Sequence, residues 1–153
     1  MGINDSDEIL EVGCGAGYFG QYIENPYVGI DPSQPLILKH QSLLDRTVCT
    51  GYAHDVPFKD KSFDYVVVIG ICAYFKDKNY TEQTIREWER VARKGIYVGN
   101  IRHSRQGKRG KHKYDGTTTH LLHTLDDFES FVEDKPFYDG QYYFCCYKQL
   151  SDP

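Results

Sequence analysis

The sequence predicts an α/β fold with a doubly wound, mostly parallel sheet, because three features of the chain agree. Short apolar runs alternate with helical patterns, which is typical of parallel strands joined by crossover helices. The run from Tyr65 to Ile69 is almost entirely β-branched, as expected for a strand that is buried on both faces. A glycine cluster at residues 13–17 follows the first apolar run, where sheets of this kind bind ligands.

The expected elements follow from the apolar runs and from the residues that begin and end helices. The expected strands are residues 8–12, 27–30, 47–50, 63–69 and 96–101. The expected helices are residues 18–24, 33–44, 81–93 and 125–132. Ser33 can cap the second helix, and Gly95 can end the third. Thr124 and Asp127 can form a capping box at the start of the fourth.

The end of the chain predicts a β-hairpin. Asp139 and Gly140 form a turn signal between two groups of strand-forming aromatic residues. A hairpin there adds antiparallel strands to the end of the sheet. Because all of these elements fit one layered architecture, a single domain is expected over residues 1–153.

The composition is that of a globular protein and argues against several classes. Hydrophobic residues make up 40% of the chain and charged residues 26%. No apolar run approaches the roughly 20 residues of a membrane-spanning helix, and the acidic N-terminal segment lacks the features of a signal peptide. Five cysteines without a CxxC pair argue against a disulfide framework and against a zinc site. A cytoplasmic protein without a bound metal or a membrane partner is therefore expected.

The glycine cluster and an acidic residue after the second strand together predict a nucleoside site. Residues 11–17 have the pattern E-x-G-x-G-x-G, in which glycines allow a tight turn and a close approach to a ligand. The longer dinucleotide fingerprint needs glycine or alanine at position 18, where the chain has Tyr18. Asp31 stands twenty positions after Glu11 and can accept hydrogen bonds from both hydroxyls of a ribose. The ribose of adenosine suits this arrangement as well as that of NAD.

Four segments resemble the class I S-adenosylmethionine-dependent methyltransferases. They are ILEVGCGAGYFG, YVGIDPS, HDVPFKDKSFDYVVV and EWERVARKGIYVGNI, and they cover residues 9–101 in the order and spacing of that family. The resemblance implies a Rossmann-like fold, in which the C-terminal hairpin is the antiparallel part. It also implies S-adenosyl-L-methionine as the cofactor and methyl transfer as the reaction. An NAD-dependent oxidoreductase is disfavoured by Tyr18 and by the short glycine spacing.

The resemblance implies cofactor-binding roles for nine residues. They are Glu11, Gly13, Cys14, Gly15, Asp31, Pro32, Asp55, Val56 and Gly70. The backbone of residues 13–15 would approach the methionine part of the cofactor, and Glu11 would brace this loop. Gly70 would lie beside the methionine amine, at the end of the fourth strand.

The nucleoside part of the cofactor would contact the other side of the crevice. Asp31 would bind the ribose hydroxyls, and Pro32 would pack against the adenine. Asp55 would accept a hydrogen bond from the adenine amine, with the backbone of Val56 nearby.

The sequence leaves the catalytic residue unknown. The methyl group of a sulfonium is already activated, so the enzyme chiefly has to align a nucleophile with it, and only some acceptors need a base. His103, His120 and His123 lie where a base could act, although a surface or capping role is the stronger interpretation for each. Tyr74 could shape the pocket or simply pack against its neighbours.

The substrate stays open between several classes. Arg102 to Lys113 carries six positive charges and no acid, whereas the whole chain has a net charge of −4. Such a segment suits an anionic substrate, and a solvated loop explains it too. The Asn/Asp-Pro-Pro-aromatic segment of enzymes that methylate base amino groups is absent after the fourth strand, so nucleic acid is disfavoured although other RNA substrates stay open. A small-molecule or sugar substrate that accepts the methyl group on oxygen or nitrogen is therefore expected.

The chain departs from the family pattern at its start. Class I methyltransferases usually carry one or two helices before the first strand, and only about seven residues precede it here. A sheet face without that cover should expose apolar surface, so a homodimer is a further expectation. The same departure keeps open an alternative, in which the chain binds the cofactor but serves as a non-catalytic partner subunit.

Overall fold

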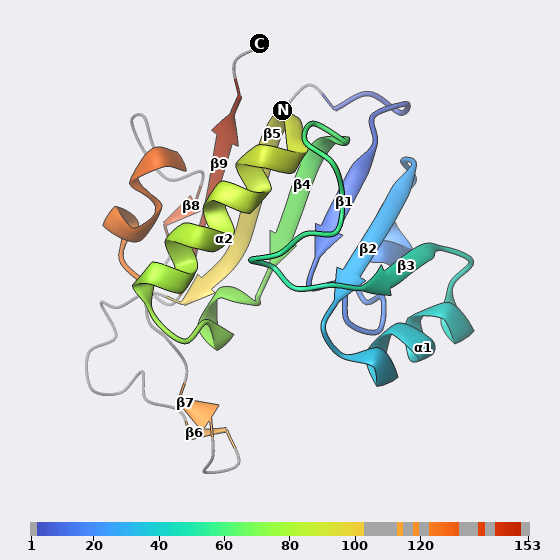
Figure 1. Ribbon diagram of the computed structural model, residues 1–153, viewed down its shortest axis with the longest axis horizontal. Coiled ribbons are helices and arrows are strands. Elements are labelled where there is room, and N and C mark those ends of the chain that lie inside the picture. Colours follow the sequence, from blue (N-terminus) through green and yellow to red (C-terminus); the bar gives the residue numbers. More distant parts are fainter. Residues whose placement is uncertain are drawn as a thin grey trace.

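The computed structural model describes residues 3–102, 113–114, 118–119, 123–131, 138–139 and 143–150. Within these residues the main sheet has seven strands in the order β3-β2-β1-β4-β5-β9-β8 (Figure 1). In chain order the strands are β1 (Ile9–Val12), β2 (Tyr27–Asp31), β3 (Thr47–Thr50), β4 (Phe63–Ile69), β5 (Ala92–Arg102), β8 (Tyr138–Asp139) and β9 (Tyr143–Gln149). The described helices are α1 (Gln34–Leu43), α2 (Lys78–Val91) and the 3-10 helices η1 (Gly20–Tyr22), η2 (Cys72–Tyr74) and η4 (Leu125–Phe131). A separate two-stranded sheet joins β6 (Lys113–Tyr114) and β7 (Thr118–Thr119).

The strand directions confirm the doubly wound, mostly parallel sheet. Strands β1 to β5 pair in parallel, whereas β9 pairs antiparallel with both β5 and β8. The chain passes from β1 outward through β2 to β3 and then returns to β4 on the other side of β1. The strand order therefore reverses between β1 and β4, and the carboxyl ends of these strands meet at the lower edge of the sheet in Figure 1. Ligands of doubly wound sheets bind at this kind of reversal.

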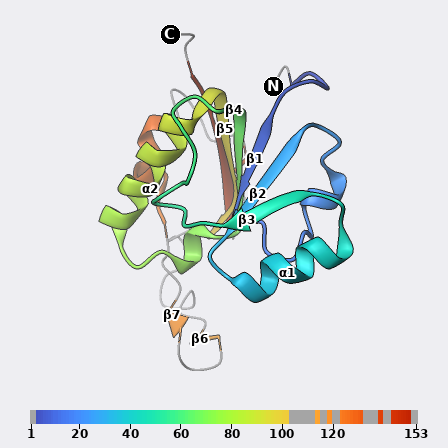
Figure 2. The same ribbon diagram turned by 45° about the vertical axis from the view of Figure 1, so that its right-hand side comes forward.

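Helices lie on both faces of the sheet, and the main core lies on the α2 side. Figure 2 shows α1 and α2 on opposite sides of the strands. Trp88 and Val91 of α2 are fully buried, as are Val66 of β4 and Ile96 of β5. Alternate residues of a strand point to opposite faces, so β4 and β5 direct Val66 and Ile96 toward α2.

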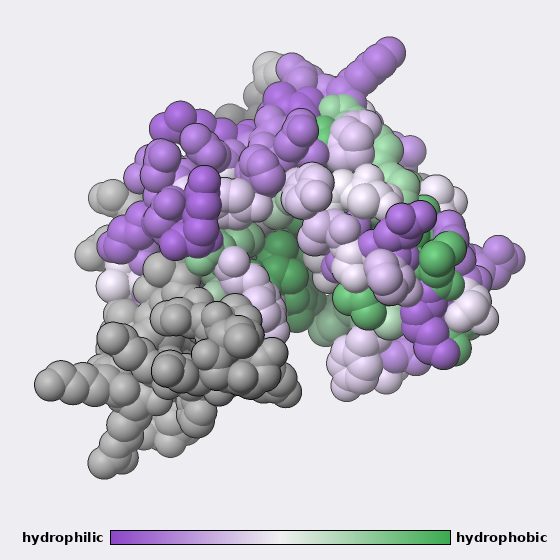
Figure 3. Space-filling model, turned by 60° about the horizontal axis from the view of Figure 1, so that its bottom comes forward, coloured by the Kyte–Doolittle hydropathy of each residue, from purple (hydrophilic) through white to green (hydrophobic). Residues whose placement is uncertain are grey.

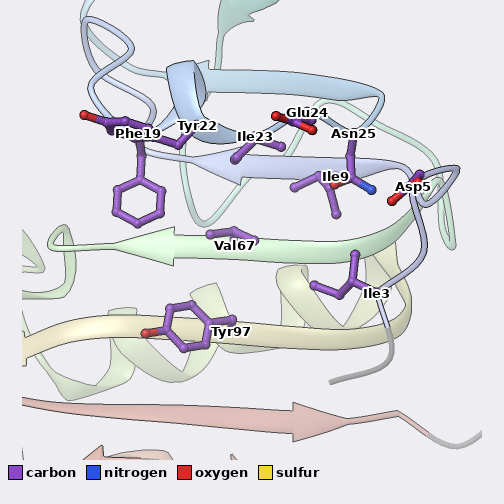
Figure 4. Close-up of a pocket in the computed structure, with 10 residues that line it drawn as sticks. All are labelled: Ile3, Asp5, Ile9, Phe19, Tyr22, Ile23, Glu24, Asn25, Val67 and Tyr97. Carbon is purple, nitrogen blue, oxygen red and sulfur yellow. The ribbon is translucent and has the colours of Figure 1, made fainter.

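The opposite face of β4 and β5 is less well covered within the described residues. Val67 and Tyr97, which alternate with the core residues of their strands, are only partly buried. A groove crosses this face beside β1 and η1 (Figure 4). We call it the sheet groove, and its lining residues are Ile3, Asp5, Ile9, Phe19, Tyr22, Ile23, Glu24, Asn25, Val67 and Tyr97.

The helix expected at residues 18–24 is wrong in type and extent. Only Gly20–Tyr22 forms a helix, and it is a single 3-10 turn. Gly17 has a φ of +90°, which interrupts helical geometry at the start of the segment. Gly20 packs so closely that a Cβ there would lie 2.9 Å from the hydroxyl of Tyr27. The segment is therefore shaped by its contacts with β2 rather than by helix propensity.

The third expected helix is displaced toward the N-terminus. α2 begins at Lys78, because the Asp77 side chain accepts a hydrogen bond of 2.7 Å from the backbone N–H of Tyr80. The helix ends at Val91, so Gly95 does not terminate it and lies inside β5 instead. A Cβ at Gly95 would meet the Tyr147 hydroxyl at 2.6 Å, which gives this glycine a packing role in the sheet.

The C-terminal elements are confirmed in position but not in helix type. η4 is a 3-10 helix with a break at Phe128, where an α-helix was expected. The Asp127 carboxylate accepts a 2.7 Å hydrogen bond from the backbone N–H of Thr124, which is one half of the expected capping box. β8 and β9 form the expected hairpin, whose Gly140 lies outside the described residues.

Candidate functional site

The glycine loop after β1 has a backbone that only glycine adopts easily. Gly13, Gly15 and Gly17 have φ values of +81°, +50° and +90°. A Cβ at Gly13 would lie 2.3 Å from Cγ2 of Ile71, so the loop contacts the segment that follows β4. A Cβ at Gly15 would meet no atom within 4 Å, so the loop is open on that side. The loop is thus closed toward β4 and accessible at Gly15.

Asp31 lies directly beside this loop, at the end of β2. Its Oδ2 accepts a 3.0 Å hydrogen bond from the N–H of Gly15, and its Oδ1 accepts one of 2.8 Å from the N–H of Ser33. The carboxylate is therefore fixed by two backbone donors. Each carboxylate oxygen has a second lone pair, which leaves it able to accept a further hydrogen bond from a ligand hydroxyl. The loop and Asp31 converge on one place, and a ribose contact at that place stays a prediction.

Glu11 is buried below the loop and bonds to a partner that the sequence did not suggest. The Tyr27 hydroxyl donates a 2.6 Å hydrogen bond to Oε2 of Glu11. Burial raises the pKa of Glu11, and the Tyr27 hydrogen bond opposes that rise. Because the same hydroxyl packs against Gly20, Tyr27 connects Glu11 to the chain that leaves the loop. Glu11 can therefore brace the loop through its hydrogen bond with Tyr27.

His40 is a second residue of the site that sequence reasoning missed. It lies on α1, is fully buried, and its Nδ1 is 3.3 Å from the carbonyl oxygen of Gly15. A carbonyl only accepts, so Nδ1 carries the proton in this contact. Burial lowers the pKa of His40, which favours the neutral ring. The signal in the sequence is the spacing of Ile37 and His40, which places a histidine on the buried face of an expected helix.

Cys14 and Pro32 differ in their exposure to solvent. Cys14 is buried, and burial raises the pKa of its thiol to about 12, so the thiol stays protonated at neutral pH. A Cβ at Gly29 of β2 would lie 2.9 Å from Sγ of Cys14, so the side chain packs against that strand. Pro32 is exposed next to Asp31.

In the segment after β3, the side chain of Asp55 is free of hydrogen bonds within the described residues, whereas the backbone of Val56 is already hydrogen-bonded. Asp55 is exposed, and its side chain has no hydrogen-bond partner in the described part of the chain. The N–H of Val56 donates a 3.1 Å hydrogen bond to Oε2 of Glu87, and its carbonyl accepts one of 3.0 Å from Arg90. The side chain of Asp55 is therefore available to a ligand, whereas the backbone polar groups of Val56 already bind α2.

Gly70 completes the site at the end of β4. Its φ is +73°, and its N–H donates a 3.0 Å hydrogen bond to the carbonyl of Gly99. A Cβ at Gly70 would lie 3.3 Å from Nδ2 of Asn100. Figure 3 shows the molecule from this edge of the sheet, where hydrophobic residues are visible inside a hollow of the surface.

Of the three histidines considered as bases, the structure describes only His123. His123 is fully buried, and its Nε2 is 3.0 Å from the carbonyl oxygen of Cys72. Burial lowers its pKa, and the ring contacts Phe75 and Phe128, so it is a core residue rather than a base. His103 and His120 lie outside the described residues, as does the basic stretch between Arg102 and Lys113.

The described residues contain neither a cluster suited to a metal ion nor a helix suited to a membrane. No group of three or more His, Cys, Asp or Glu side chains there could hold a metal ion. No helix among them is long and apolar enough to cross a membrane.

A match to a known domain family identifies the family of this chain. Residues 10–98, more than half of the chain, match the family described as methyltransferase domain. The chain belongs to the methyltransferase domain family. This confirms the resemblance seen in the sequence, and the matched region includes every residue of the candidate site.

Two relatives of this methyltransferase domain are 30% identical to it. One is the uncharacterized protein MJ1252 of Methanocaldococcus jannaschii, over 102 residues that make up 65% of this chain and 38% of the relative. The other is the human protein named probable tRNA methyltransferase 9B, over 96 residues that make up 59% of this chain and 21% of the relative. The chain therefore matches well under half the length of either relative.

Solved structures share the fold of the methyltransferase domain. The PH0226 protein of Pyrococcus horikoshii OT3 has a TM-score of 0.78 and 19% identity, covering 95% of this chain and 82% of that one. The methyltransferase component of a complex with the Haloferax volcanii Trm112 methyltransferase activator has a TM-score of 0.69 and 18% identity, covering 84% of this chain and 60% of that one. These likenesses confirm the Rossmann-like α/β fold.

Proposed function

We propose that this methyltransferase domain binds S-adenosyl-L-methionine between the glycine loop and Asp31 and transfers its methyl group to an oxygen or nitrogen atom of a substrate. The observation that carries the proposal is the 3.0 Å hydrogen bond between the N–H of Gly15 and Oδ2 of Asp31. It places a carboxylate beside a glycine at which a Cβ would meet no atom within 4 Å. The cofactor supplies an activated methyl group on a sulfonium sulfur.

The residues of the site fit the parts of such a cofactor. The Asp31 carboxylate is suited to the ribose hydroxyls, and exposed Pro32 offers an apolar surface beside it. The open carboxylate of Asp55 can accept a hydrogen bond from an adenine amine. The backbone of Gly13 and Gly15 would lie along the methionine part, and a side chain at Gly15 would project into the open space beside it.

The contribution of the protein to the reaction is alignment rather than covalent chemistry. The buried neighbours of the loop hold its backbone in place, because Asp31 and His40 both bond to Gly15. A fixed loop fixes the approach of the substrate, and correct orientation can lower a barrier by several kcal/mol. No described side chain is assigned as a base.

For the substrate we propose an anionic small molecule or sugar. The support is the basic stretch between Arg102 and Lys113, which follows the end of β5 in the sequence. Clustered cations attract anions over about 10 Å at ordinary ionic strength. We further propose that residues 1–153 form one domain and act in the cytoplasm; the described cysteines are all free thiols, which suits a reducing compartment.

A partner subunit that binds the cofactor without catalysis is a second candidate function. The sheet groove favours it, because Val67 and Tyr97 are left partly exposed on a face that another chain could cover. The Trm112 complex shows that a protein of this fold assembles with another chain. A homodimer through the same face is an alternative use of the groove.

Calorimetric titration with S-adenosylhomocysteine, the demethylated product, tests the cofactor assignment. We expect saturable one-to-one binding and a rise in melting temperature of several degrees at about 100 times the dissociation constant. NAD in a parallel titration should show neither effect. Binding of NAD alone, or of neither ligand, would contradict the proposal. Transfer of a labelled methyl group to an added acceptor then separates an enzyme from a non-catalytic partner.

A further inference from the structure

Asn100, near the carboxyl end of β5, has a backbone conformation that asparagine tolerates and most residues avoid. Its φ is +56°, and Lys61 is the other non-glycine residue with a positive φ among the described residues. Internal contacts hold Lys61, because its N–H bonds to the Arg90 carbonyl and its Nζ bonds to the Ala92 carbonyl. The Asn100 side chain has no hydrogen-bond partner in the part of the chain that the structure describes. Strain that no internal contact explains is typical of residues that act on a ligand.

A β-bulge in β5 turns the Asn100 side chain away from the core. Ile96 and Val98 are buried in the core on the α2 side, so regular alternation would direct Asn100 into the same core. The register with β9 shifts between Val98 and Ile101, where three steps along β5 stand opposite two along β9. The extra residue passes the core position to Ile101, which is fully buried, and leaves Asn100 exposed. Bulges re-aim side chains in this way and are frequent next to active sites.

The redirected amide lies at the candidate site. A Cβ at Gly70 would be 3.3 Å from Nδ2 of Asn100, so the amide lies beside the end of β4. The N–H of Gly70 bonds to the carbonyl of Gly99, which holds the two strand ends together. Both strands end at the lower edge of the sheet in Figure 1, which is also the edge of the glycine loop.

The strand order puts Asn100 at the opposite end of the site from Asp31. β1 and β4 lie between β5 and β2, the strand that ends in Asp31. Neighbouring strands are about 4.8 Å apart, so the two residues are separated by about 14 Å across the sheet. A cofactor with its ribose at Asp31 and its methionine part along the glycine loop would leave the space at β4 and β5 to the acceptor. The acceptor atom must come within about 3.5 Å of the methyl carbon, so the amide of Asn100 is placed to contact it.

We propose that the side-chain amide of Asn100 orients the methyl acceptor of the substrate by a hydrogen bond. The inference rests on the proposed function and narrows the acceptor to a hydroxyl or a neutral amine. Such a group bears a hydrogen for Oδ1 of Asn100 and keeps a lone pair for the methyl carbon, while Nδ2 can donate to a neighbouring hydroxyl, as on a sugar.

The amide orients the reacting groups and takes no proton. The lone pair of the acceptor forms the new bond to the methyl carbon, and the carbon–sulfur bond breaks with its electron pair going to sulfur. S-adenosylhomocysteine is the product, and the proton of the acceptor passes to water. Asn100 is therefore a substrate-orienting residue rather than a base.

Sinefungin, a cofactor analogue with an amine in place of the S-methyl group, tests this placement. Its amine lies where the methyl group points toward the acceptor, whereas S-adenosylhomocysteine has no group there, so calorimetric titrations of the two ligands are compared. Asn100→Gly removes the amide and adopts positive φ without strain, so it should weaken sinefungin binding about tenfold and leave S-adenosylhomocysteine affinity within about twofold. Asn100→Asp keeps an oxygen acceptor and should bind sinefungin at least as tightly as the wild type. Lys61→Gly, the matched control at positive φ, should leave the ratio of the two affinities unchanged.

The outcomes for the acceptor site and for the cofactor site are separable. Equal sinefungin affinity in wild type and Asn100→Gly overturns the acceptor assignment, and so does a lower ratio of sinefungin to S-adenosylhomocysteine affinity in Asn100→Asp. An equal loss of both ligands in Asn100→Gly, with circular dichroism unchanged, would assign the amide to the cofactor and overturn the proposal too. Binding of S-adenosylhomocysteine by the wild type leaves the proposed function standing in all three cases, and its absence overturns the proposed function itself.

Discussion

Asp31 and His40 hold Gly15 from two sides, the first through its N–H and the second through its carbonyl oxygen. One partner ends strand β2 and the other lies on helix α1, so the middle of the glycine loop is attached to both layers of the fold. A Cβ at Gly15 would meet no atom within 4 Å, so the loop is open on that side. A loop held by two partners loses little conformational entropy when a ligand binds to it.

We expect Asp31→Ala to weaken S-adenosylhomocysteine binding about 10- to 100-fold. A hydrogen bond to a charged group contributes about 1.5–3 kcal/mol, and the variant removes the carboxylate that would accept the ribose hydroxyls. Titration calorimetry measures the affinity, and circular dichroism checks that the fold is retained. Asp45→Ala, which removes an exposed carboxylate beyond the end of α1, is the control. Unchanged affinity in Asp31→Ala would show that the ribose lies elsewhere.

We expect Gly13→Ala to affect mainly stability and Gly15→Ala to affect mainly cofactor affinity. An added Cβ at Gly13 would clash with Ile71 at 2.3 Å, whereas at Gly15 it would enter open space. Both positions have positive φ, which costs about 1–2 kcal/mol for alanine. Gly13→Ala should therefore lose more stability in urea unfolding, by a further 1–3 kcal/mol or so for overpacking. Gly15→Ala should stay folded and lose cofactor affinity, and a normal titration of that variant would place the cofactor on another side of the loop.

The sequence predicted the sheet well because each strand has a recognisable local pattern of residues. The β-branched run at residues 66–69 and the glycines that follow its neighbour β1 specify a central strand and the loop beside it without any tertiary information. The expected helix at 18–24 failed because tertiary contacts override its propensity: Gly20 packs against Tyr27 of β2. A local pattern does not report such a contact.

The parts of the site that the sequence did not predict depend on residues that are distant along the chain. His40 reaches the carbonyl of Gly15 across 25 positions, and His54 reaches Tyr80 across 26. His40 lies outside the four segments that resemble the family, and His54 begins one of them, but neither contact can be read from the sequence.

We expect the stability of the protein to fall as the pH drops below about 6.5, and His40 to contribute to this fall. Burial lowers the pKa of His40 in the folded state, so the unfolded chain takes up its proton first as the pH falls. The neutral ring stabilises the fold above the unfolded pKa, and this contribution is lost as the pH drops toward the folded pKa. Urea unfolding between pH 7.5 and about 5 measures it.

His40→Gln separates this contribution from that of His123, whose pKa is lowered by burial as well. The variant should show a smaller loss of unfolding free energy over the same pH range, and the remainder should disappear in the double variant with His123→Gln. An identical pH profile for wild type and His40→Gln would mean that His40 is not held neutral in the fold.

We expect the protein to self-associate through the sheet groove at high concentration. Val67 and Tyr97 leave apolar surface on the part of the sheet face at β4 and β5, which no α-helix covers within the described residues. Val67→Lys should shift sedimentation velocity profiles toward the monomer, because a charge at an apolar contact is costly to bury. Leu38→Lys, a change at an exposed position on α1, should leave the profile unchanged. A protein that stays monomeric at all concentrations would contradict self-association through the groove, and a different protein would then be its expected partner.

We expect Asp64→Asn to lower stability without affecting cofactor binding. Asp64 lies at the amino end of β4, opposite the site, where Arg93 donates two hydrogen bonds of 3.1 Å to its carboxylate and Glu8 donates one of 2.9 Å from its backbone. The Arg93 hydrogen bonds hold the pKa of Asp64 well below its usual range. The charged form therefore stabilises the fold above about pH 4, and this stabilisation is lost as the pH falls further.

The variant should cost about 1–3 kcal/mol at pH 7, because Arg93 loses one of its two charged partners and keeps only Glu8. It should also flatten the loss of stability between pH 4 and about 2. Urea unfolding at several pH values measures both effects, and titration with S-adenosylhomocysteine should give the wild-type affinity. The two ends of the strands then have separate tasks, since charge pairs at the amino end stabilise the sheet and the glycine loop at the carboxyl end binds the ligand. A drop in cofactor affinity equal to that of Asp31→Ala would contradict this division.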